Sequence, residues 1–182
     1  MFAEKHNSYD ALSLEGTPEI WAADESTREV DAADGVELLG MSSHGSRAVR
    51  QATTQRGVRE SGGANSGVPL LRYVRYFVPG SGPLPWCAFF VSWCFDTTGD
   101  QNHRMPWDNA GYVGSIRSWA QATGRLQTAP QHGDIFGIGT EHTGLVAGSD
   151  PARRIIWTIE GNWGDSVAQR NLAWSGLWFA RL

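Results

Sequence analysis

The sequence lacks the features that mark several classes of protein. Its 182 residues contain only two cysteines, too few for a disulfide framework or a four-thiolate zinc site. No stretch approaches the roughly 18 consecutive apolar residues of a membrane-spanning helix. Residues 1–16 lack a basic stretch followed by an apolar one, so we expect no secretory signal. A net charge of −4 argues against a nucleic-acid partner.

Charge is distributed unevenly along the chain. Residues 1–48 contain ten acidic and three basic residues, a net charge of −7. Residues 49–182 contain nine acidic and twelve basic residues, a net charge of +3. Because the acidic part is poor in periodic apolar residues, we predict that residues 1–46 form a weakly structured extension, with room for a short helix near 18–31. Residues 47–182 are predicted to form one folded domain, and the extension is a candidate docking or delivery element.

The domain is predicted to place helices first and strands afterwards. Helices are expected at 47–57, 68–78, 86–95 and 111–124. The third is apolar nearly all round, as a buried central helix would be. In the second, the helical spacing puts one apolar face on Val68, Leu71, Val74, Phe77 and Val78. Strand-like runs at 133–139, 142–148, 154–161, 167–174 and 177–182 are separated by short turn signals, which favours an antiparallel sheet and an α+β fold.

Cys87 is a candidate nucleophile because it begins the apolar helix. A helix N-terminus has partial positive charge and free N–H groups, which favour a thiolate and can form an oxyanion hole. Taken alone, Cys87 is better explained as a small buried hydrophobic residue. Cys94 lies seven residues later, about 10 Å away along a helix, which is too far for a disulfide. We therefore expect Cys94 to be a core residue.

A general base and its orienting group are predicted on the strands. His142 opens a strand directly after a glycine-rich turn, whereas the other four histidines lie in the extension or in polar loops. Glu160 and Asn162 end the next strand, and alternation points both side chains to one side. Pairing of these strands would bring Glu160 or Asn162 beside His142, where either could fix the imidazole tautomer. An ordinary turn at Gly161-Asn162 explains the same residues without catalysis.

These residues occur in the order of a known family. The segments PWCAFFVSWCF, GDIFGIGTEHTGLVAG and IIWTIEGNWGDSVAQRN, with the loop ESGGANSG upstream, resemble the CHAP family. These cysteine- and histidine-dependent amidohydrolase/peptidase domains belong to the papain-like superfamily. The resemblance covers roughly residues 47–182 and implies N-terminal helices packed on a C-terminal antiparallel sheet. It implies cleavage of an amide bond in bacterial peptidoglycan, either at the first alanine or within the stem peptide or cross-bridge.

The resemblance also implies a role for each site residue. Cys87 would be the nucleophile, His142 the base and then the acid, Glu160 the orienting group and Asn162 an assisting polar residue. Trp86 and Trp163 are candidate substrate-binding residues, although core packing is the commoner role of tryptophan. The chain departs from the family pattern at Phe89-Phe90, which follow Cys87 and Ala88, and at Thr143-Gly144, which follow His142.

No cofactor or metal is expected. The loop before the cysteine offers one carboxylate, Glu60, whereas calcium needs six to eight oxygen ligands. A Cys-His-Glu zinc site is the other metal interpretation, and a cysteine at a helix start fits a nucleophile better.

The leading hypothesis is a peptidoglycan hydrolase, released onto the bacterial cell wall by a phage or through an export system. A cysteine amidase acting on another amide and a non-catalytic wall-binding module are the alternatives. The bond cleaved, the origin and the oligomeric state do not follow from the sequence.

Overall fold

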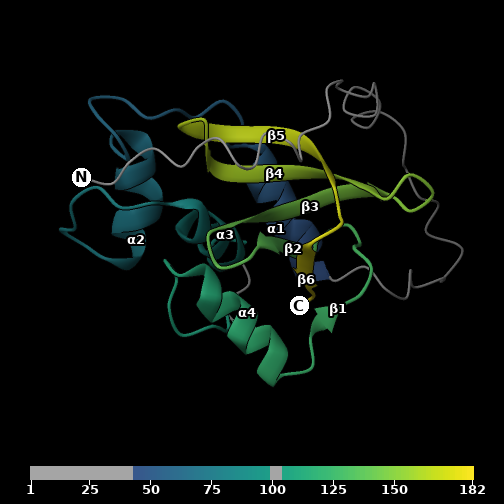
Figure 1. The fold of residues 1–182 in the computed structure, drawn as a ribbon. Helices are drawn as coiled ribbons and strands as arrows, with labels where there is room; N and C mark the ends of the chain where they lie inside the picture. The colour runs from purple at the N-terminus through teal and green to yellow at the C-terminus, as the bar shows by residue number, and fades with distance from the viewer. Residues whose placement is uncertain (1–42, 99–103) are drawn as a thin grey trace, which may run out of the picture.

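The computed structural model describes residues 43–98 and 104–182, where helices precede a six-stranded antiparallel sheet (Figure 1). The helical elements are α1 (Ser43–Thr53), the π-helical turn η3 (Leu70–Val74), α2 (Arg75–Phe77), α3 (Cys87–Asp96) and α4 (Val113–Ala122). The strands are β1 (Leu126–Gln127), β2 (Ile135–Ile138), β3 (His142–Asp150), β4 (Ile155–Trp163), β5 (Ser166–Ala173) and β6 (Leu177–Ala180). The expected α+β fold is therefore confirmed.

The predicted elements differ from the observed ones mainly at their ends. Helix α1 begins at Ser43, so the domain boundary expected after residue 46 falls within this helix. The short strand β1 was not predicted, and it pairs with β6 at the edge of the sheet. The helix expected near 18–31 lies outside the described residues.

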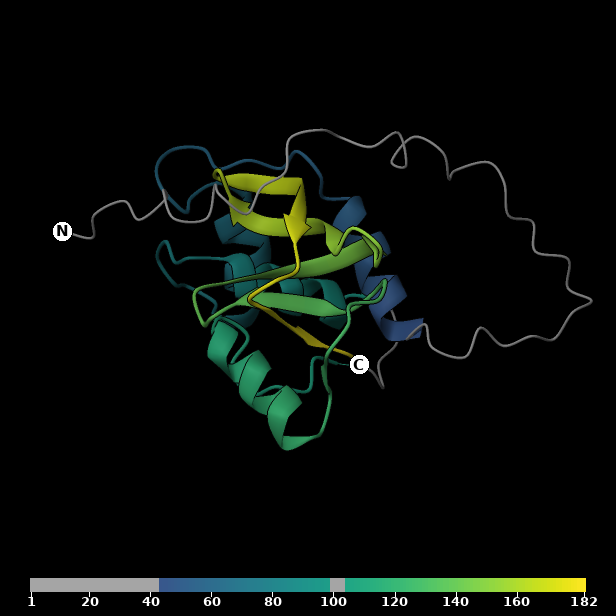
Figure 2. The same cartoon turned by 45° about the vertical axis from the view of Figure 1, so that its right-hand side comes forward.

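The sheet runs in the order β1-β6-β2-β3-β4-β5, and helices α1 and α3 both contact β3 and β4. Figure 2 shows α1 and α3 behind these strands. Helix α4 lies below the sheet and contacts β1 and β6. The other face carries a smaller buried cluster, made of Phe136, Val146, Ile156, Leu172 and Phe179. The sheet is thus covered by apolar groups on both faces.

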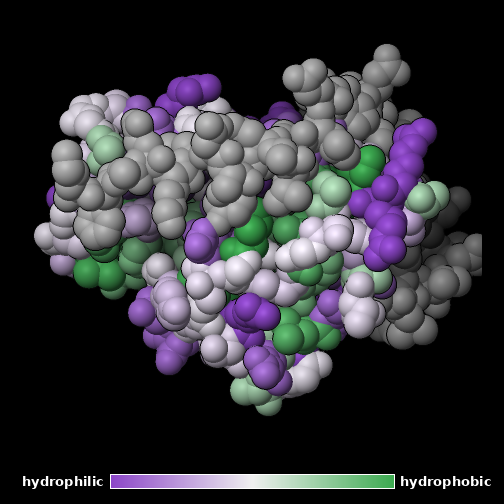
Figure 3. All heavy atoms as spheres, viewed as in Figure 1, coloured by the Kyte–Doolittle hydropathy of each residue, from purple (hydrophilic) through white to green (hydrophobic). Residues whose placement is uncertain are grey.

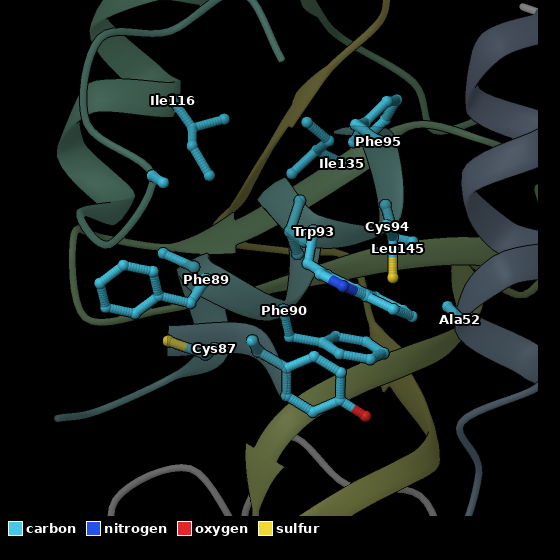
Figure 4. Close-up of a cluster of buried hydrophobic side chains, with 14 of the residues drawn as sticks. Ala52, Cys87, Phe89, Phe90, Trp93, Cys94, Phe95, Ile116, Ile135 and Leu145 are labelled. Atoms are coloured by element: carbon cyan, nitrogen blue, oxygen red, sulfur yellow. The ribbon is translucent and has the colours of Figure 1, made fainter. Parts of the chain in front are cut away.

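Helix α3 forms the centre of the main core. Every residue from Cys87 to Phe95 is buried, which agrees with its apolar sequence on all sides (Figure 4). The ring of Tyr73 lies 5.4 Å from that of Trp86 and 5.1 Å from those of Phe90 and Trp93. This aromatic packing fixes α3 against the preceding helical segment.

The apolar face predicted for 68–78 is correct at Val74 and Phe77, which pack in the core, and wrong at its other three positions. Leu70, Tyr73 and Val74 are the buried residues there, while Val68 and Leu71 are 41% and 61% exposed. Residues 70–74 form the π-helical turn η3, in which the residues per turn differ from the α-helical spacing on which the prediction was based. On the face drawn in Figure 3, hydrophobic residues at the surface lie in separate groups among hydrophilic ones.

Strands β4 and β5 form a tight hairpin. Trp163 pairs with Ser166, and the two residues between them, Gly164 and Asp165, both have positive φ angles of 54° and 57°. This is the backbone of a type I′ turn, whose twist matches that of the flanking strands. The hairpin sets the register that places the functional side chains below.

No helix in the described part of the chain is long and apolar enough to span a bilayer.

We expect Leu145→Ala to lower the free energy of unfolding by about 2–5 kcal/mol, because it leaves a cavity beneath α3. Leu145 is fully buried on β3. Leu71→Ala is the matched control, since it removes the same atoms from an exposed site. Urea denaturation of both variants is the measurement, and equal losses would contradict the assigned core.

Candidate active site

Cys87 is the first residue of α3, and the residue before it is bound to the preceding loop. Trp86 precedes it, is fully buried, and donates its indole N–H to Oε1 of Glu60 over 2.7 Å. Glu60 is held beside the β4–β5 turn because its backbone N–H donates to the carbonyl of Asp165 over 2.8 Å. The start of α3 is therefore tied to both the preceding loop and the sheet.

His142 and Glu160 form a buried pair on neighbouring strands. His142 Nε2 lies 2.7 Å from Glu160 Oε2, and their side chains are 9% and 0% exposed. The Cys87 thiol donates to the carbonyl of Glu141 over 4.0 Å, which places it next to His142, and Cys87 is one of the groups that raise the pKa of this imidazole. The structure therefore brings together three of the predicted residues in the order thiol, imidazole, carboxylate.

The environment favours charge on His142. Burial opposes the imidazolium and lowers its pKa, but the neighbouring Cys87 side chain, the hydrogen bond that Glu160 accepts and the charge of Glu160 outweigh this and raise the pKa to about 9. For Glu160, burial opposes ionisation, yet His142 and Arg170 lower its pKa overall. Both shifts favour the charged pair, in which an imidazolium donates to a carboxylate.

Arg170 on β5 is a functional neighbour that sequence reasoning missed. Its Nε and Nη2 donate to Oε1 and Oε2 of Glu160 over 3.0 Å and 2.9 Å. The Thr158 hydroxyl also donates to Glu160 Oε1. The sequence signal was a single basic residue in the strand 167–174, on the same alternating face as Leu172. A lone arginine on a buried strand face indicates a buried acidic partner.

Gly144 gives Glu160 the space to reach His142. A Cβ atom at Gly144 would lie 2.8 Å from Glu160 Cγ and 2.7 Å from Cε1 of Phe136. Both distances are shorter than real Cβ contacts, so a larger residue would push the carboxylate aside. The departure from the family pattern at this position is therefore part of the site's packing.

Asn162 does not face the imidazole. A register shift between Glu160 and Trp163 and a positive φ of 63° at Asn162 interrupt the expected alternation. Its side-chain amide donates instead to Asn65 Oδ1 over 3.2 Å. Asn162 thus joins the end of β4 to the loop that carries Glu60.

The two candidate tryptophans differ in exposure. Trp86 is fully buried, so its indole offers no surface to a substrate. Trp163 is half-buried, and its ring lies 5.5 Å from that of His142 and 3.4 Å below the Arg170 guanidinium. Trp163 therefore covers the charged residues of the site.

The two cysteines have different environments. Cys94 is fully buried and forms no disulfide. Burial raises the pKa of its thiol. Figure 4 shows Cys87 and Cys94 at separate places in the core. Only Cys87 lies beside a base.

Among residues 43–98 and 104–182, no group of three or more His, Cys, Asp or Glu side chains is arranged to hold a metal ion. His44 and His132 contact the backbone carbonyls of Phe95 and Ala147. His6 and His103 lie outside the described residues.

A thiol beside an imidazole that is hydrogen-bonded to a carboxylate is the arrangement with which cysteine hydrolases activate a nucleophile. Residues 79–162 match the family model of the CHAP domain, the family that the sequence motifs resemble. The match supports an amidase or peptidase that acts on peptidoglycan. Comparison with the curated proteins and with the solved structures found no match.

The raised pKa of His142 predicts a pH-dependent stability. A folded-state pKa of about 9 exceeds the ordinary value of 6.5, so the contribution is complete below pH 6.5 and is lost as the pH rises through about 9. We expect the free energy of unfolding of the wild type, relative to His142→Gln, to fall across this window. Urea denaturation between pH 6 and 10 measures it, with Glu160→Gln as a control in which the slope is weaker. A pH-independent difference would contradict the charged pair.

Gly144→Ala is expected to displace Glu160 and to lower the pKa of His142, because the imidazolium loses its carboxylate. Overpacking should also cost about 1–3 kcal/mol of stability. Gly148→Ala on the same strand is the matched control, since its Cβ would meet the Trp157 side chain instead. NMR titration of the histidines measures the effect. A pKa of about 9 in both variants would show that Gly144 has no role in placing Glu160.

Proposed function

We propose that this chain hydrolyses an amide bond of bacterial peptidoglycan, as an N-acetylmuramoyl-L-alanine amidase or as an endopeptidase of the stem peptide or cross-bridge. The line Cys87–His142–Glu160, within a segment that matches the CHAP domain, carries the proposal. Residues 49–182 have a net charge of +3, which suits a largely anionic cell-wall polymer. The setting that we propose is a bacterial cell wall reached through a phage or an export system.

In the proposed reaction, the Cys87 thiolate attacks the amide carbon and forms a C–S bond. The first-turn N–H groups of α3, which lack intrahelical acceptors, stabilise the oxyanion. The His142 imidazolium donates a proton to the leaving nitrogen, the C–N bond breaks, and an acyl-thioester remains. The neutral His142 then takes a proton from water, the hydroxide attacks the thioester, and the acid product and the thiolate are released.

Glu160 and Asn162 have distinct proposed roles. Glu160 keeps the His142 ring oriented and charged, because it accepts the Nε2 proton. Asn162 assists by fixing the end of β4 through Asn65 instead of binding the ring. Trp163 keeps water from the His142–Glu160 pair and presents its exposed edge to the substrate.

Cys87→Ala should abolish the activity, by about a thousand-fold or more, because it removes the nucleophile. Purified peptidoglycan is incubated with each protein, and the products are identified by mass spectrometry. New N-terminal alanine would identify an amidase, and new termini within the stem or bridge an endopeptidase. Cys94→Ala makes the same substitution in the core, and its folded fraction should remain active.

Equal products from the wild type and Cys87→Ala would refute the cysteine mechanism. A wild type that releases no fragment, but whose Cys87 reacts readily with an alkylating reagent, would instead favour the alternative of another amide substrate.

A further inference from the structure

We propose, on the basis of the proposed function, that Arg170 is a positioning residue of this site: acting through Glu160, it fixes the orientation and the charge of the carboxylate that holds His142 beside Cys87. Arg170 makes no contact with the reacting atoms. Its effect passes across three adjacent strands, from β5 through β4 to β3.

Strand pairing places Arg170 where it meets both carboxylate oxygens. Arg170 pairs with Thr158, two residues before Glu160 on the same face of β4. The guanidinium donates side-on through Nε and Nη2, a two-bond geometry that lysine cannot reproduce. The Arg170 side chain is 5% exposed, and Glu160 is fully buried. The contact is thus a desolvated, bidentate ion pair.

The carboxylate of Glu160 is locked in rotation. Oε1 accepts from Arg170 Nε and the Thr158 hydroxyl, while Oε2 accepts from Arg170 Nη2 and His142 Nε2. Turning the carboxylate would break two charge-assisted hydrogen bonds among side chains that are almost fully buried. His142 therefore always meets the same oxygen.

The positive charge of Arg170 stays beside Glu160 when His142 loses its own charge during the reaction. His142 loses its proton to the leaving nitrogen and becomes neutral, which removes the partner of a fully buried carboxylate. A buried carboxylate without a cation is strongly disfavoured and takes up a proton. Arginine does not deprotonate in proteins, so Arg170 keeps Glu160 ionised through this step and ready to stabilise the next imidazolium.

The ionisable groups that face this unit come from three elements: Cys87 from α3, Glu160 from β4 and Arg170 from β5. Trp163 covers the guanidinium at 3.4 Å and also contacts the His142 ring, so it screens both cations from water. Removal of Arg170 would leave Glu160 with a single, titratable cation.

The rate of Cys87 alkylation by iodoacetamide, measured against pH in the full chain, tests this role without a substrate. At acidic pH the alkylation rate falls, and in Arg170→Met this fall (the acidic limb of the profile) should move up by about one pH unit. The reason is that Glu160 without Arg170 takes up a proton at a higher pH and no longer stabilises the imidazolium. Peptide mass spectrometry separates the two thiols. Labelling of Cys94, which is fully buried, reports the unfolded fraction in the same sample.

Arg181→Met is the matched control. Arg181 also forms a two-bond ion pair, with Asp134 over 2.7 Å and 2.8 Å. Asp134 precedes the first residue of β2, whereas His142 pairs with Ile138 at the other end of that strand. This variant should lose stability and keep the wild-type profile. Arg170→Lys retains the charge without the fork, so its limb should lie between those of the wild type and Arg170→Met.

An unshifted acidic limb in folded Arg170→Met would overturn the proposal and leave Arg170 a merely structural residue. If that variant does not fold, a wild-type limb in Arg170→Lys has the same consequence. A shifted limb without peptidoglycan cleavage by the wild type would contradict the proposed function alone. Cleavage with an unshifted limb would contradict only the role of Arg170.

Discussion

The buried carboxylate of Glu160 is the constraint on which the site depends. A fully desolvated negative charge is tolerated only when cations and hydrogen-bond donors surround it, and here His142, Arg170 and Thr158 supply them. The same contacts hold the imidazole toward Cys87. The chemistry of the thiol is therefore linked to strand positions that no substrate touches.

The sheet positions the charged side chains of the site, and separate contacts position the helix that carries the thiol. Three adjacent strands each contribute one charged side chain, so the spacing of the ionic contacts follows from antiparallel register. Gly144 provides the space between two of these strands. Aromatic packing and the Glu60–Trp86 hydrogen bond fix the helix that carries the thiol. The nucleophile and its base thus belong to separately anchored elements.

Much of this arrangement could be predicted from the sequence, because local signals specify it. The all-apolar run predicted the central helix at α3, and His142 and Glu160 were predicted at strand ends that pair. The face of residues 68–78 was predicted only in part, since it was based on an α-helical spacing and residues 70–74 form a π-helical turn. Arg170 was missed because its partner is set by the β4–β5 register, which a single sequence does not specify. The bulge at Asn162 likewise overrode strand alternation.

The isolation of Cys87 from the other cysteine has a consequence for oxidation. A reactive thiol that meets peroxide forms a sulfenic acid, and many proteins limit the damage by condensing it with a nearby resolving thiol. This chain has one other cysteine, enclosed in the core and about two helical turns away. Oxidised Cys87 therefore depends on an external reductant for recovery, and further oxidation to sulfinic acid would end its reactivity permanently.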